Sequence, residues 1–273
     1  MKLSFEPNEH KYTSDEEPDK KWISVTTLIE KFSPKEDFEK IAEKISKSKK
    51  SKWYGLSKEE ILQAWSDENK RSTDLGTWYH EMRENKSYND GVYIADGKEI
   101  PVVRPLEEMG LKVSSEQQLK DGYYPEHLCY LKSNCICGQS DVVIVHDGVL
   151  DIKDYKTNKK IDRYSYSDWN GVSKKMLPPL QHLDDCNLSH YALQLSMYMY
   201  MILKHNPQLT PGTIEIIHAS FKKEGENKYG YPIYAKDENG NFIVESETVY
   251  EIAYMKKEIQ SILKYMEKND IFI

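Results

Sequence analysis

The sequence predicts a mixed α/β fold, and three observations support this prediction. Segments typical of strands occupy the middle of the chain, segments typical of helices lie on both sides of them, and no Pro-, Gly- or Ser-rich linker divides the 273 residues. We therefore expect one domain over residues 1–273, with a core of about 22–221 and peripheral N- and C-terminal elements.

The strand predictions rest on runs rich in β-branched and aromatic residues that are bounded by turn residues. Asp147-Gly148, between two such runs, is typical of a tight hairpin turn. Two short extended pieces, at about 5–12 and 21–25, precede these runs. We expect strands at Val113–Lys120, Cys129–Leu131, Ser140–His146, Val149–Lys156 and Thr213–Phe221.

The helix predictions rest on capping residues, on Pro breaks and on apolar residues at helical spacing. Ser57 followed by Glu60 forms a capping box, and Pro34 and Pro207 each end a helical segment. We expect helices at Thr26–Lys31, Lys58–Asn69, Thr73–Glu84, Ser189–His205 and Glu245–Lys268.

Composition restricts the compartment and the partners. The 38 Lys plus Arg and 45 Asp plus Glu give a net charge of −7, which argues against nucleic-acid binding over the whole surface. No apolar run approaches the ~18 residues that span a bilayer, and the N-terminus carries charges where a signal peptide is apolar. The four Cys form no CxxC pair. We expect a cytoplasmic protein with free thiols and no membrane partner.

Two carboxylates and a lysine in the middle of the chain suggest metal-assisted hydrolysis of a phosphodiester. Side chains alternate along a strand, so Asp154 and Lys156 share one face of the strand Val149–Lys156. The hairpin could bring Asp141 toward Asp154, although the sequence does not fix the register. Carboxylates hold Mg²⁺, which also binds phosphate, and a Lys can position the attacking water. The alternative interpretation is a surface hairpin with a salt bridge.

Further polar residues are candidates, each with an ordinary structural alternative. Gln194 and Tyr198 lie four residues apart on one face of the predicted helix, where burial against backbone partners is the alternative. His80 could ligate a metal, although a single His is more often structural. Glu116 lies on a predicted strand, where an ordinary solvent-facing carboxylate is the alternative.

Several short motifs occur in a fixed order along residues 22–205, and their joint order is more specific than any one of them. They are Gly76-Thr77-x-x-His80, Glu116, Gly138-x-x-Asp141, Asp154-Tyr155-Lys156-Thr157 and Gln194-x-x-x-Tyr198. This order resembles the RecB-like exonuclease branch of the PD-(D/E)XK nuclease superfamily. The early Ser24-Val25-Thr26-Thr27 is similar to a segment of phage and mitochondrial single-strand exonucleases.

The resemblance implies a restriction-endonuclease-like fold, in which α-helices flank a central mixed β-sheet. It also implies a Mg²⁺- or Mn²⁺-dependent deoxyribonuclease that acts on DNA ends or single strands, in a bacterium or a phage-infected cell. Some RecB-like nucleases hold an iron–sulfur cluster through one early and three late Cys. All four Cys of this chain lie between 129 and 186, so we expect no such cluster.

The resemblance further implies a role for each motif residue. The metal ligands would be His80, Asp141, Asp154 and the carbonyl of Tyr155. Lys156 would act on the attacking water, and Gln194 and Tyr198 would orient Lys156 or a DNA phosphate. Glu116 would support the metal or the water. Glu126 is its rival, and we favour Glu116 because Val113 and Leu119 on either side of it fit a strand better.

A basic segment offers a surface for DNA. Residues 44–58 contain six Lys and no acid, and cations beside aromatic rings hold single strands without reading their sequence. A solvated Lys-rich loop is the alternative. We expect DNA contacts at Lys49, Lys50, Lys52, Trp53, Tyr54, Lys159, Lys160 and Arg163. Two other functions stay open for the chain: a nuclease-fold protein that binds DNA or a partner without cutting, and an RNA or nucleotide phosphohydrolase.

Overall fold

A computed structural model describes residues 1–6, 9, 11–108, 110–114, 117–167 and 170–269. Its centre is a six-stranded mixed sheet in the order β14-β11-β10-β9-β3, with β8 also paired to β9. β10 runs parallel to β11 and β3 runs parallel to β9, whereas the pairs β8–β9, β9–β10 and β11–β14 are antiparallel. The strands of this sheet are β3 (Ile23–Ser24), β8 (Gly122–Leu131), β9 (Ile136–His146), β10 (Val149–Lys156), β11 (Thr210–Phe221) and β14 (Val244–Glu251).

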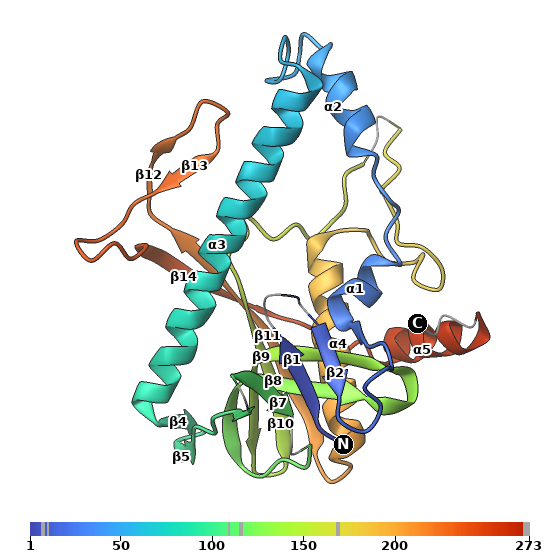
Figure 1. Cartoon of the computed structure of the whole chain (residues 1–273), viewed down its shortest axis with the longest axis vertical. Coiled ribbons are helices and arrows are strands. Elements are labelled where there is room, and N and C mark those ends of the chain that lie inside the picture. Colours follow the sequence, from blue (N-terminus) through green and yellow to red (C-terminus); the bar gives the residue numbers. More distant parts are fainter. Residues whose placement is uncertain (7–8, 10, 109, 115–116, 168–169, 270–273) are drawn as a thin grey trace.

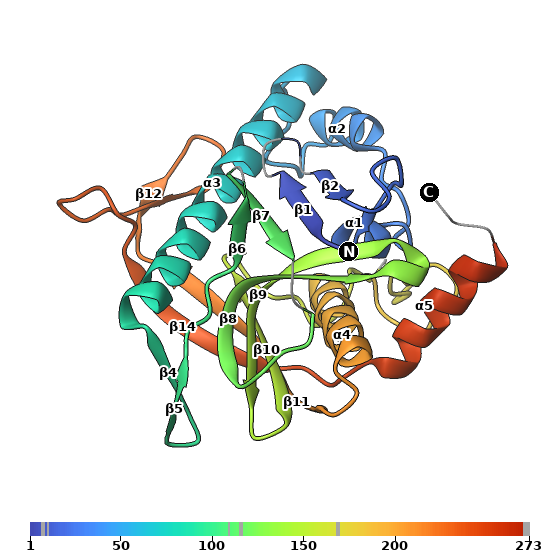
Figure 2. The same cartoon turned by 60° about the horizontal axis from the view of Figure 1, so that its bottom comes forward.

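Helices cover both faces of this sheet, as Figure 1 and Figure 2 show. On one face, α4 buries a leucine- and methionine-rich surface against Leu150, Ile152 and Ile216, together with α1 and α5. On the other face, α3 packs Leu75 and Tyr79 against the sheet. The helices are α1 (Val25–Glu30), α2 (Phe38–Ser46), α3 (Lys58–Asp90), α4 (Asn187–His205) and α5 (Lys256–Lys268). The predicted mixed α/β class is therefore confirmed.

Three small sheets lie around the central one. An N-terminal sheet has the order β2-β1-β7-β6, and two hairpins, β4-β5 and β12-β13, project beside α3. These strands are β1 (Leu3–Glu6), β2 (Lys11–Ser14), β4 (Val92–Ala95), β5 (Lys98–Pro101), β6 (Leu106–Glu108), β7 (Leu111–Ser114), β12 (Lys223–Glu226) and β13 (Pro232–Tyr234).

Two helix predictions were wrong in their boundaries. The expected helices Lys58–Asn69 and Thr73–Glu84 are one continuous helix, α3, whose predicted capping box at Ser57 and Glu60 is confirmed. Between its buried residues Ala64 and Leu75 this helix is largely solvent-exposed, so the apolar periodicity lapses although the helix does not.

The expected helix Glu245–Lys268 is a strand followed by a shorter helix. Its first half is β14, the edge strand of the central sheet, in which acidic residues alternate with hydroxyl and apolar ones. Charged side chains are usual on an edge strand because they discourage pairing with other chains. The expected strand Val113–Lys120 is also displaced: β7 ends at Ser114, and residues 115–116 lie outside the described part of the chain.

A candidate metal centre beside an aspartate–lysine pair

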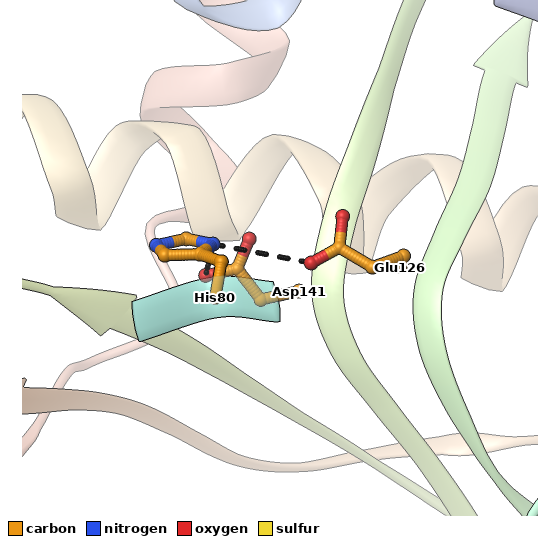
Figure 3. A group of neighbouring side chains, drawn as sticks. All are labelled: His80, Glu126 and Asp141. Atoms are coloured by element: carbon orange, nitrogen blue, oxygen red, sulfur yellow. Dashed lines mark ion pairs between the residues drawn. The ribbon is translucent and has the colours of Figure 1, made fainter. Parts of the chain in front are cut away.

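Three potential metal ligands converge where α3 crosses β8 and β9. His80 comes from α3, Glu126 from β8 and Asp141 from β9, and one ligand atom of each lies within 4.8 Å of the others (Figure 3). His80 Nδ1 is 3.5 Å from Asp141 Oδ2 and 3.9 Å from Glu126 Oε1. One imidazole and two carboxylates on three separate elements can surround a single divalent cation.

Strand register brings the two carboxylates together. β8 and β9 pair Pro125 with Val142 and His127 with Ser140, so Glu126 lies opposite Asp141. The backbone φ of Glu126 is +51°, in the left-handed region that non-glycine residues rarely adopt. Strained backbone of this kind clusters at functional sites, where the surrounding structure holds it in place. Here the antiparallel pairing on both sides of Glu126 provides that hold.

Hydrogen bonds fix the orientation of each ligand. The carbonyl oxygen of Tyr155 can only accept, so His80 Nε2–H donates to it across 3.1 Å, and Nδ1 is left facing the carboxylates. The backbone N–H of Tyr155 donates to Asp141 Oδ2 at 2.7 Å, and Gln139 Nε2 donates to Glu126 Oε2 at 2.6 Å. Side chains held by such partners are typical of metal sites, and an imidazole with two carboxylates can bind a divalent cation.

Burial and neighbouring charges shift the pKa values of His80 and Asp141. Burial alone would lower the pKa of His80, but Asp141 and Glu126 outweigh it and raise that pKa to about 9. Burial, opposed by the positive charge of His80, raises the pKa of Asp141. A divalent cation that binds His80 would displace a proton from the ligating nitrogen, because a ligating imidazole nitrogen must be deprotonated.

Asp154 and Lys156 form a second element of the site on β10. The two side chains make an ion pair, and Asp154 is only 1 % exposed. Burial and the nearby Asp141 raise the pKa of Asp154 to about 6 against the opposing effect of Lys156. The pKa of Lys156 is raised, because Asp154 and Asp141 outweigh the lowering effect of burial.

An aromatic ring that the sequence did not single out covers this lysine. Lys156 Nζ lies 4.8 Å from the ring centroid of Tyr191 on α4, within cation–π range. The Tyr191 hydroxyl donates to Asn158 Oδ1 at 2.8 Å, which links α4 to the segment after β10. Tyr191 lies three residues before Gln194, on the same side of the helix, and this spacing is the signal that could have revealed it.

Gln194 and Tyr198 lie on α4 and are hydrogen-bonded to each other. Gln194 Nε2 donates to the Tyr198 hydroxyl at 3.1 Å, and no described contact joins either side chain to Lys156. Tyr198 is buried, and its ring occupies the space that a Cβ at Gly138 would need. The expected motif residues therefore pack against each other as a helix–strand contact.

The expected metal ligands are only partly together. His80 and Asp141 meet in the cluster, whereas Asp154 forms an ion pair with Lys156. The Tyr155 carbonyl accepts a hydrogen bond from His80. Glu116 lies outside the described residues. Its rival Glu126 occupies the acidic position of the cluster. The hairpin turn near Ser133-Asn134 could have favoured Glu126 over Glu116, because a chain reversal centred there sets Glu126 opposite Asp141.

The basic segment is arranged differently from the expectation. Trp53 is 6 % exposed and packs against Trp65 and Tyr229, with ring centroids 6.1 and 5.3 Å away. This burial contradicts the expected stacking of a base on Trp53, since the ring closes a small core at the tip of α3 instead. Lys52 Nζ donates to the Tyr229 carbonyl at 2.7 Å, so it joins that tip to the β12-β13 hairpin.

The other expected DNA-contacting residues lie at the surface. Tyr54 is 52 % exposed, and Lys49 and Lys50 are exposed in the turn before α3. Beyond β10, Lys159 pairs with Glu68 at 2.7 Å, Lys160 pairs with Asp162 at 2.7 Å, and the Arg163 guanidinium lies 5.7 Å from the Tyr250 ring. Only Lys159, Lys160 and Arg163 follow β10 closely, because Lys49, Lys50 and Tyr54 lie before the first residue of α3, roughly 30 Å or more along the helix from His80.

Comparisons with known protein families, with curated protein sequences and with solved structures found no match to this chain. Within the ranges that the structure describes, no helix is both long and apolar enough to cross a membrane. The functional argument therefore rests on the site geometry: three convergent side chains that could hold a metal lie beside the ion pair of Asp154 and Lys156.

Proposed function

We propose that this protein is a metal-dependent DNA exonuclease that hydrolyses phosphodiester bonds at DNA ends or in single strands. The observation that carries the proposal is the convergence of His80, Glu126 and Asp141 within 4.8 Å, next to the ion pair of Asp154 and Lys156. Metal-assisted hydrolysis needs oxygen-rich ligands together with a group that acts on the attacking water.

The site residues would divide the work as follows. His80, Glu126 and Asp141 would hold Mg²⁺ or Mn²⁺, which when bound supplies charge for the phosphate and a more acidic water. The Lys156 ammonium would position that water or take up phosphate charge. Asp154, by its ion pair, would hold the ammonium in place.

The fold is compatible with a restriction-endonuclease-like architecture. Its central sheet mixes parallel and antiparallel strands, and helices pack on both faces. Asp141 and the Asp154–Lys156 pair lie on adjacent strands, β9 and β10, at a place that α3 supplies with His80. The order of motifs along the sequence supports the same assignment.

The test is cleavage of end-labelled single-stranded DNA, duplex DNA and RNA with Mg²⁺ or Mn²⁺. We expect DNA to be cut and cutting to be abolished by chelation, by Asp141→Asn and by Lys156→Ala. The matched control is Lys153→Ala, because Lys153 lies on the same strand but pairs with Glu215 at 2.9 Å. Equal activity of wild type and Lys156→Ala would refute the proposal, DNA binding without cleavage would favour a silent binder, and cleavage of RNA alone would favour a ribonuclease.

A further inference from the structure

A pocket of about 420 Å³ opens next to the candidate metal centre. Three elements form its walls: the exposed middle of α3, the segment 157–160 that follows β10, and the β12-β13 hairpin. Its volume is in the range of small-ligand pockets, roughly 300–1,000 Å³. The segment 157–160 begins directly after Lys156, so the pocket adjoins the proposed catalytic lysine.

The distance to the metal centre follows from helix geometry. Ser72 and Leu75 line the pocket and His80 is a proposed ligand, all on α3. At 1.5 Å per residue, the pocket wall lies roughly 7–12 Å along the helix from His80. Gly76, between them, would set a Cβ 3.4 Å from Thr157 Oγ1, so helix and loop are in close contact there. A strand that extends from the metal centre along α3 toward the N-terminal end of the helix would therefore reach this pocket.

Aromatic rings form the apolar part of the pocket. Trp65, Tyr231 and Tyr234 line it, and the Lys52 and Lys159 ammonium groups lie 4.6 and 4.2 Å from the Tyr231 centroid. In the part of the chain that the structure describes, no ammonium or guanidinium lies over Trp65 or Tyr234. Trp65 contacts Trp53 and Phe38 in T-shaped geometry, and Tyr234 contacts Phe221 at an interplanar angle of 58°. Neither ring is stacked on a described aromatic partner, so a flat ligand such as a base can stack there.

The polar groups of the pocket match the edge and the phosphate of a nucleotide. Asn69 and Ser72 line it, and neither side chain makes a hydrogen bond to any described residue. Amide and hydroxyl groups of this kind read the edges of unpaired bases. Glu68 also lines the pocket, but Lys159 and Arg71 both pair with its carboxylate. Lys160 is 75 % exposed at the rim and can reach a phosphate.

We propose that this pocket binds one unpaired nucleotide of the DNA strand being cut, beside the scissile phosphate. The inference rests on the proposed nuclease function for the identity of the strand. A paired base hides the edge that Asn69 and Ser72 would contact, and its partner would collide with the wall. The pocket therefore selects single strands or frayed ends over intact duplex.

The test measures binding without cleavage, in EDTA. A short fluorescent oligothymidylate is compared with a backbone of equal length whose nucleotides are all abasic. Stacking of one base is worth about 1–3 kcal/mol, so wild type should bind the thymidine strand roughly tenfold more tightly. Ser72→Phe, which fills the pocket, should bring that ratio close to one. The matched control, Ser66→Phe, changes another exposed serine of α3 that does not line the pocket and should keep the ratio.

A second pair of variants tests the phosphate contact. Lys160→Gln should lower the slope of log affinity against log salt by about 0.7, the value for one cation on a single strand. Lys98→Gln is the control, since Lys98 is 65 % exposed and paired with an aspartate, as Lys160 is, but lies on β5. Circular dichroism melting of all four variants shows that they are folded.

The outcomes separate this inference from the proposed function. Equal binding of abasic and thymidine strands by wild type would refute nucleotide binding in the pocket, even if metal-dependent cleavage persists. Equal effects of Ser72→Phe and Ser66→Phe would refute it as well. Tighter binding of the thymidine strand without any cleavage would support nucleotide binding in the pocket and refute the proposed nuclease activity. If thymidine monophosphate binds as tightly as the strand, the pocket takes a free nucleotide and the strand assignment is wrong.

Discussion

The contact between Gly138 and Tyr198 gives a prediction whose size follows from the structure. A Cβ on Gly138 would lie 2.6 Å from Tyr198 Cε1 and 3.2 Å from its hydroxyl oxygen, whereas ordinary contact begins at 3.4 Å. The φ of Gly138 is not in the left-handed region, so Gly138→Ala adds a steric conflict without backbone strain. Tyr198 is buried and hydrogen-bonded to Gln194, so its ring cannot move away freely.

Overpacking of this kind costs about 1–3 kcal/mol. For a chain of this size, a loss of about 2 kcal/mol lowers the melting temperature by roughly 4–8 °C. Thermal and urea denaturation followed by circular dichroism measure the effect. Gly225→Ala is the control, because a Cβ there meets nothing within 4 Å and Gly225 also lacks a positive φ.

A double-mutant cycle isolates the contact itself. Tyr198→Leu alone leaves a cavity, but in the Gly138→Ala background the same change relieves the collision. The two costs should therefore be less than additive, by about 1 kcal/mol or more. Strict additivity, or a melting temperature of Gly138→Ala within about 1 °C of wild type, would refute the steric argument.

Three further predictions concern the site and the tip of α3. Glu126→Gln should abolish calorimetric Mn²⁺ binding and Glu116→Gln should preserve it, and the reverse pattern would show that the wrong acid was assigned. Tyr191→Leu should slow DNA cleavage roughly tenfold through loss of the cation–π contact while Tyr191→Phe stays near wild type, so equal rates for both variants would count against this role. Trp53→Ala should lower the free energy of unfolding by about 3–5 kcal/mol, and Tyr54→Ala should lower it by less than about 0.5 kcal/mol. Weaker DNA binding by a Trp53→Ala protein of unchanged stability would indicate that a base stacks directly on Trp53.

Local signals predicted much of the sheet. The turn at Asp147-Gly148 and the β-branched runs around it gave strand β10 with its observed ends, and the pairing with β9 followed. Both turn residues have positive φ, as such a turn requires. Helix periodicity was less informative where the helix is exposed, because few apolar residues repeat at helical spacing in the middle of α3.

The candidate site depended on information that no short segment contains. Glu126 and Asp141 belong to strands whose relative register is set by a turn at some distance from both. The position of Tyr191 over Lys156 depends on how α4 packs on the sheet. Trp53 looked like a surface aromatic among lysines because its partners, Tyr229 and Tyr231, lie far away in the sequence. Residue types could thus be listed in advance, but their pairing could not.

The unbroken course of α3 limits where this chain tolerates insertions and deletions. One helix carries Trp65 in the pocket and His80 at the candidate metal centre. Each residue turns an α-helix by about 100°, so deleting one residue between them would rotate the pocket wall away while the metal ligand stayed in place. Inserting seven residues, about two turns, would restore the direction of the wall but move it roughly 10 Å farther away. Lengths in this stretch are therefore expected to change by whole turns, or not at all.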